Sequence, residues 1–139
     1  MRIKKLLALF LLGGAMLMQG CAGSARSDNF QTLEVSFEWQ GNAGSLSSPN
    51  PEIVVSNIPA GTAFLQVRMK DLDYPHNHGG GLVSYDGKGV IPVGALQSYD
   101  GPQPPAGQVH TYVFTVTALN QDKSLALGEG SASRQYPEK

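Results

Sequence analysis

The stretch "HTYVFTVTAL" (110–119) sets the fold class. Large or apolar side chains stand at every second position, at Tyr112, Phe114, Val116 and Ala118, and β-branched residues dominate the positions between them. Successive side chains of a β-strand point to opposite faces of the sheet. The stretch therefore predicts a strand with one face in the core.

The same period of two recurs along most of the chain. Turns rich in glycine, proline, serine and asparagine separate the alternating segments, and no segment has the pattern of a long amphipathic helix. The other predicted strands lie within residues 32–39, 52–58, 63–70 and 81–96. After Leu119 we expect one turn or a short helix. Short strands with many breaks favour an all-β (mainly β) sandwich of two antiparallel sheets with at most short helical turns; Trp39 is expected in its core.

The first 20 residues have the features of an export signal. Arg2, Lys4 and Lys5 form a charged start, and an apolar run follows at 6–18. That run is shorter than the roughly 20 apolar residues of a membrane-spanning helix. We therefore predict that residues 1–20 are a signal peptide and take no part in the fold.

Cys21, the only cysteine, follows a small residue at the end of this signal. It cannot form a disulfide within the chain, and its position resembles a bacterial lipobox. The prediction is a lipoprotein with lipid (palmitate) on Cys21, which would anchor it to the membrane, and a flexible tether over residues 21–30. The alternative is an ordinary secretory signal with a chance cysteine. Ala22 stands where aspartate would favour inner-membrane retention, so we expect the outer membrane and a periplasm-facing domain.

Residues 31–139 have the length of one domain. Without residues 1–20 the chain keeps seven lysines and arginines against eleven acidic residues, and no basic cluster remains. Nucleic acid is therefore not an expected partner. Nothing in the composition calls for a cofactor.

Polar residues that could form a site gather in two loops. "KDLDYPHNHGGG" (70–81) holds two aspartates and two histidines, and "DGPQPPAGQVH" (100–110) holds three prolines and the third histidine. Loops at the ends of strands meet at one end of a sandwich, where sites are commonly built. We expect the two loops to form one site.

Three kinds of site remain open from the residues alone. His76 and His78 with Asp71 or Asp73 could form a metal site. The second is a site for nucleophilic catalysis, although no arrangement such as Ser-His-Asp is recognisable. A pocket in which protonated imidazoles and loop N–H groups hold a small anion is the third. Alternatively, His76 is a solvated loop residue and Asp73 caps a turn.

Three motifs resemble the phosphatidylethanolamine-binding protein family, in its bacterial YbhB/YbcL (Raf-kinase-inhibitor-like) branch. They are "NIPAGT" (57–62), "DLDYP" (71–75) and "YDGPQPPAGQVHTYVFTVTAL" (99–119). The family pattern has an Asp-x-Asp-x-Pro motif and a Gly-Pro-x-Pro-Pro motif followed by His-x-Tyr. The resemblance covers about residues 48–120, and the proline motif with its His-x-Tyr is its most specific part.

The resemblance implies a β-sandwich with a small anion-binding pocket at one end, which holds a phosphate or phosphorylated headgroup without metal. The expected ligand-binding residues are Asp71, Asp73, Pro75, His78, Gly101, Pro102, Pro104, Pro105, His110 and Tyr112. His110, His78 and Tyr112 would donate to the anion, Asp71 would orient a histidine, and the proline loop would exclude water. Leu72 replaces a proline and Thr111 an arginine of the family pattern, and a glycine-rich stretch (78–87) replaces a Trp-His stretch.

The expected function is non-catalytic binding of a small anion, phosphate or a phospho-headgroup, or a carboxylate, in the bacterial envelope. No catalytic residue and no resident metal are expected. The alternative is a protein-interaction, scaffold or inhibitor module with an envelope protein as partner. A metal-dependent or other hydrolase is a third reading.

Overall fold

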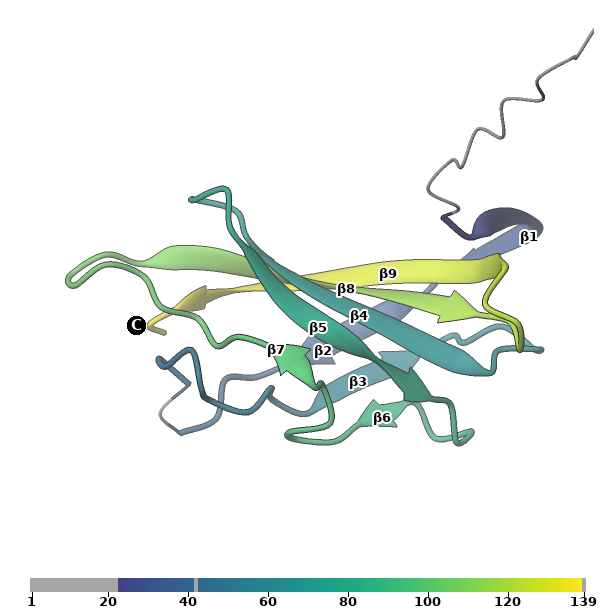
Figure 1. The fold of residues 1–139 in the computed structure, drawn as a ribbon, viewed down its shortest axis with the longest axis horizontal. Helices are drawn as coiled ribbons and strands as arrows, with labels where there is room; N and C mark the ends of the chain where they lie inside the picture. The colour runs from purple at the N-terminus through teal and green to yellow at the C-terminus, as the bar shows by residue number, and fades with distance from the viewer. Residues whose placement is uncertain (1–22, 42, 139) are drawn as a thin grey trace, which may run out of the picture.

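The computed structural model of the protein describes residues 23–41 and 43–138, and this part of the chain forms nine strands (Figure 1). The strands are β1 (Ala25–Thr32), β2 (Glu34–Phe37), β3 (Ile53–Ser56), β4 (Phe64–Asp71), β5 (Asn77–Ser84), β6 (Val90–Ile91), β7 (Ser98–Tyr99), β8 (His110–Leu119) and β9 (Leu125–Tyr136). No helix occurs among the described residues.

The strands form two sheets that face each other. The larger has the order β1-β9-β8-β4-β5-β7 and the smaller the order β2-β3-β6. In Figure 1 the smaller sheet lies below the larger one. All pairs are antiparallel except β1 with β9, which is parallel. The predicted β-sandwich is confirmed, with one parallel pair in an otherwise antiparallel sheet.

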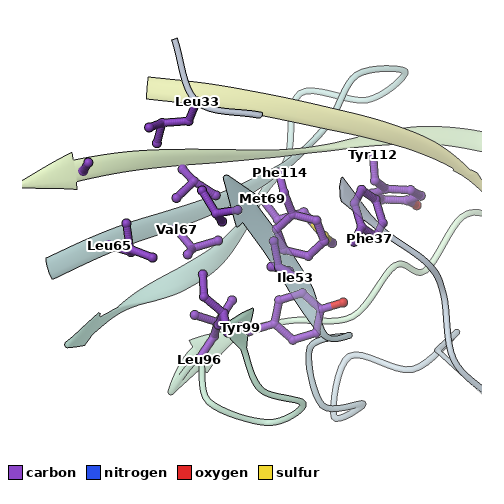
Figure 2. Packing of buried hydrophobic residues seen from close by; sticks show 14 residues of the cluster. Leu33, Phe37, Ile53, Leu65, Val67, Met69, Leu96, Tyr99, Tyr112 and Phe114 are labelled. Carbon is purple, nitrogen blue, oxygen red and sulfur yellow. The ribbon is translucent and has the colours of Figure 1, made fainter. Parts of the chain in front are cut away.

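Strand β8 is central to the larger sheet, paired with β4 on one side and β9 on the other. Tyr112, Phe114, Val116 and Ala118 are fully buried, as their alternation predicts, whereas the residues between them are partly exposed. Figure 2 shows Phe114 and Tyr112 beside Phe37 of the smaller sheet. Trp39 packs against this core with its indole N–H donating to the Gln135 carbonyl at 2.9 Å.

The turn expected after Leu119 is present, but no short helix follows among the described residues, and most of this segment is the long strand β9. Only a tight turn separates β8 from β9, with Lys123 at a positive φ of 62°. The sequence does not show the hydrophobic alternation of a strand here, because glycines occupy several of its positions. A Cβ on Gly130 would lie 2.2 Å from the Leu33 carbonyl oxygen, so the close passage of the chain at Leu33 requires glycine there.

Residues 25–30 lie in strand β1, whereas we expected them in the tether. They begin a parallel pairing with β9, in which Ala25 is opposite Leu125 and Gln31 is opposite Gly128. Their side chains are mostly exposed, so hydrophobic alternation does not mark the strand. Backbone pairing at a sheet edge places them there. The predicted signal peptide and Cys21 lie outside the described residues.

We expect Phe114→Ala to lower the free energy of unfolding by about 3–5 kcal/mol, because it removes a large side chain from a closed core. Phe114 is fully buried and packs edge-on against Phe37 with ring centroids 4.8 Å apart. Denaturant unfolding followed by the fluorescence of Trp39 measures the change. Ser133→Ala, on the exposed side of β9, is the control and should change stability by less than about 0.5 kcal/mol. Equal effects of the two substitutions would contradict the assignment of this core.

Candidate functional site

A cavity of about 550 Å³ lies at the end of the larger sheet where β4 ends and β8 begins. Its wall comes from the β4–β5 loop, the start of β5, the proline-rich loop before β8 and one residue of the segment before β3. The lining residues are Leu46, Asp71, Asp73, Tyr74, His76, His78, Gln103, Pro105, Gln108 and His110. The two loops that the sequence predicts to form one site therefore do meet.

Asp71 joins the two loops through both of its carboxylate oxygens. Oδ1 accepts hydrogen bonds from the backbone N–H groups of Asp73 at 2.8 Å and Tyr74 at 3.0 Å, and thereby shapes the loop after β4. Oδ2 lies 2.6 Å from Nδ1 of His110, the first residue of β8. Only 4% of the Asp71 side chain and 11% of the His110 side chain are exposed. Asp71 is thus in contact with a histidine, as its expected role requires.

The same contacts decide the charge of Asp71. Burial alone would raise its pKa, because a carboxylate loses hydration. The hydrogen bonds from His110 and from the N–H groups of Asp73 and Tyr74 outweigh burial, so the pKa of Asp71 lies below its usual value. Asp71 is therefore a carboxylate at neutral pH, with both oxygens engaged.

Asp73 fixes the loop to β8. Its Oδ2 accepts a hydrogen bond from the backbone N–H of Thr111, and the N–H of Leu72 donates to the Thr111 carbonyl at 2.8 Å. The N–H groups of the turn donate to Asp71, and the Asp73 side chain instead ties the turn to the neighbouring strand. These bonds hold the cavity wall against the start of β8.

His78 approaches the cavity from β5. It is 3% exposed, and its Nδ1 lies 3.1 Å from the Asp100 carbonyl oxygen of the proline-rich loop. That contact requires a proton on Nδ1, because a carbonyl oxygen only accepts. No hydrogen bond to Nε2 of His78 occurs in the described part of the chain. His76, exposed as expected of a loop residue, also lines the cavity and meets the His78 ring edge-on at 4.6 Å.

Tyr112 lies beneath the histidines and does not line the cavity. Its ring meets His78 edge-on at 5.2 Å and lies nearly parallel to His110 at 6.4 Å. Its hydroxyl is buried and has no hydrogen-bond partner among the described residues. Burial, and next the charge of Asp71, raise the pKa of this phenol. Its place in the structure makes Tyr112 a support for both imidazoles.

The structure divides the predicted binding residues into two groups. Asp71, Asp73, His78, Pro105 and His110 line the cavity, whereas the others lie beside or behind its wall: Pro75, Gly101, Pro102, Pro104 and Tyr112. Packing requires a glycine at position 101, because a Cβ there would lie 2.1 Å from the Ser45 carbonyl oxygen. Its N–H also donates to the Leu46 carbonyl, which joins the proline loop to the segment before β3.

Sequence reasoning did not assign Leu46, Tyr74, Gln103 or Gln108 to the site. Leu46 comes from a distant glycine- and serine-rich segment, so no local signal pointed to it. Gln108 stands two residues before His110 and could have been found by the strand period, because residues i and i+2 share a face. As for the metal reading, no group of three or more potential ligands that could hold an ion occurs within residues 23–41 and 43–138.

Comparison with known proteins agrees with this architecture. Residues 81–137 match the family described as phosphatidylethanolamine-binding protein. Over 87 residues the chain is 36% identical to the protein YbhB of Escherichia coli (strain K12), a match that covers 57% of this chain and 45% of YbhB. The resemblance to the phosphatidylethanolamine-binding protein family that the motifs predict is confirmed by these matches. The family match includes His110 and Tyr112, whereas residues 71–78 precede it.

Two solved structures share the fold. One is YbcL of E. coli, described as a new member of the mammalian PEBP family, with a TM-score of 0.58 at 18% identity, covering 78% of this chain and 100% of that chain. The other is a putative PEBP homolog, CT736 of Chlamydia trachomatis D/UW-3/CX, with a TM-score of 0.53 at 13% identity, covering 78% of this chain and 99% of that one. At these identities the likeness concerns the fold alone. The match to YbhB spans less than half of that relative's length.

We expect the stability contributed by Asp71 to depend on pH. Because its pKa is lowered by folding, the contribution is fully present above the pKa of an unfolded aspartate, about 3.9, and is lost as the pH falls through the lower folded pKa. Asp71→Asn should therefore be less stable than wild type at pH 7, and the difference should shrink below about pH 4. Urea unfolding across this range measures both proteins. Asp86→Asn, in an exposed turn, is the control; a difference for Asp71→Asn that stays constant with pH would contradict the assignment.

Proposed function

We propose that this chain is a non-catalytic binding protein whose cavity holds a small anion, a phosphate or a phosphorylated headgroup. The observation that carries the proposal is the buried hydrogen bond of 2.6 Å between Asp71 and His110 on the cavity wall. His78 lines the same cavity from the opposite loop. Membership in a ligand-binding family supports a binding role in general.

The two histidines supply the donors that an anion needs. Nδ1 of His110 is bonded to Asp71, so a ligand would have to bind at Nε2. A protonated imidazole carries a hydrogen on each nitrogen, and a hydrogen bond from a charged donor to an anionic oxygen is roughly twice as strong as one between neutral groups. In this geometry Asp71 balances the charge of the imidazolium while Nε2 binds the anion.

The remaining lining residues set the strength and kind of binding. No lysine or arginine lines the cavity, and two carboxylates do, so affinity for inorganic phosphate is modest. Three exposed apolar side chains stand at or beside the mouth: Leu46 (46% exposed), Leu72 (59%) and Tyr74 (62%). Such a rim favours a ligand that carries an apolar part next to its anion.

Calorimetric titration with inorganic phosphate and with phosphoethanolamine tests the pocket. We expect His110→Ala to weaken binding about 10- to 100-fold, the range for a lost hydrogen bond to a charged group. His76→Ala removes an exposed imidazole from the same cavity, without the bond to a carboxylate, and should have a smaller effect. Unchanged binding in His110→Ala would show that the anion site lies elsewhere.

We further propose that the domain is held at the bacterial envelope by lipid on Cys21, a residue outside the described part of the chain. The support is the charged and apolar segment before it and the polar residues after it. Among the described residues no helix is long and apolar enough to span a membrane.

Cys21→Ser in the full-length protein tests the anchor. The expected result is loss of labelled palmitate incorporation and a shift from the membrane fraction to the soluble fraction, because the acyl chains supply the membrane affinity. Wild type and Ser47→Ala, which alters an exposed serine of the domain, should remain membrane-bound and labelled. A Cys21→Ser protein that still sediments with membranes would exclude lipid on this residue as the anchor.

A further inference from the structure

One side chain already occupies the nitrogen that the proposed ligand would use. The Gln108 Oε1 atom lies 3.2 Å from Nε2 of His110, while Nδ1 of the same ring is bonded to Asp71. Both nitrogens of His110 are therefore engaged by the protein itself. Gln108 lines the cavity, so the contact lies where a ligand would bind.

The Gln108 side chain can move away from His110 while the backbone of the loop keeps its conformation. The Gln108 N–H donates to the Pro105 carbonyl at 2.9 Å, and Gly107 completes the turn at a positive φ of 80°. Prolines at 102, 104 and 105 restrict the loop further. The Gln108 side chain, in contrast, is exposed and makes no other hydrogen bond within the described part of the chain. A change of side-chain rotamer is enough to free His110.

We propose that Gln108 is an internal competitor for the anion, and that it determines which ligands the cavity accepts. This inference rests on the proposed function of the cavity. A carboxamide oxygen is a neutral acceptor. A neutral ligand oxygen would replace it with a bond of similar strength and gain little. An anionic oxygen forms the stronger, charge-assisted bond to a protonated imidazole and displaces the amide.

The competitor also acts when His110 is neutral. With the Nδ1 proton directed at Asp71, a neutral ring has a lone pair on Nε2. The Gln108 amide can turn its NH₂ group toward that lone pair, so the same side chain occupies the nitrogen in either state. His110 is then exposed to a ligand only when an anion meets the protonated ring.

Gln103 is a matched control for Gln108. It has the same side chain, is also exposed, and lines the same cavity from the same loop. No hydrogen bond joins its side chain to His110. Substitution at the two positions therefore removes the same atoms from the cavity and differs only in whether His110 is released.

The experiment titrates wild type, Gln108→Ala, Gln103→Ala and Gln108→Glu with inorganic phosphate at one fixed pH. We expect Gln108→Ala to bind about 3- to 10-fold more tightly than wild type, the equivalent of one hydrogen bond between the amide and the ring that no longer has to be broken. Gln103→Ala should not gain affinity. Gln108→Glu places an anionic competitor on the same nitrogen and should bind more weakly than wild type.

The ¹⁵N chemical shift of His110 Nε2, measured in the ligand-free proteins, gives a second readout. It should change in Gln108→Ala and stay in place in Gln103→Ala. If Gln108 instead helps to hold the ligand through its NH₂ group, Gln108→Ala binds phosphate equally or less tightly, and the competitor role is overturned while the pocket stands. Absence of phosphate binding in wild type and all variants would instead overturn the proposed function.

Discussion

The register between β4 and β8 is the constraint on which both the core and the site depend. In this antiparallel pair Met69 is opposite Phe114 and Asp71 is opposite Tyr112. The alternation along both strands places Met69, Phe114 and Tyr112 in the core and brings Asp71, at the end of the same buried row, to His110. A shift of either strand by one residue would turn that strand's side chains to the other face. The apolar residues thus fix the position of the charged pair.

The sequence predicts the strands whose alternation is strong. Residues of β2, β3, β4 and β8 alternate between buried and exposed as the pattern indicates, because each has one face on the core. The pattern fails for β9 and β1. Glycines such as Gly128 and Gly130 take positions in β9 where another chain segment passes too closely for a side chain. Strand β1 is held by backbone pairing at an edge, with its side chains largely exposed. The spacing of hydrophobic residues does not reveal a strand that is held by its backbone pairing rather than by burial of its side chains.

The site is predictable where its chemistry is local and less so where it is assembled by folding. Asp71 and His110 follow from their motifs, and the structure brings them together. The contribution of Leu46 depends on a long segment between β2 and β3 and needs the whole fold. Tyr112 was expected as a donor to the ligand because a phenol can donate, but the sequence does not show how deeply its hydroxyl is buried. Its hydroxyl is buried without a hydrogen-bond partner among the described residues, and Tyr112 is not among the residues that line the cavity.

The two departures from the family pattern nearest the site act on its rim rather than on its charged pair. At Leu72 and Thr111 the structure uses backbone groups: the Leu72 N–H donates to the Thr111 carbonyl, and the Thr111 N–H donates to Asp73. The Thr111 N–H bond does not depend on the side chain at 111, whereas the Leu72 N–H bond could not form with the proline of the family pattern, which has no N–H. The contact between Asp71 and His110 uses neither residue. What changes is the surface beside the cavity, where Leu72 is 59% exposed and no arginine contributes charge. In the proposed function the buried pair would set the class of ligand as anionic, and the exposed side chains around it, with Gln108 in contact with His110, would select among anions.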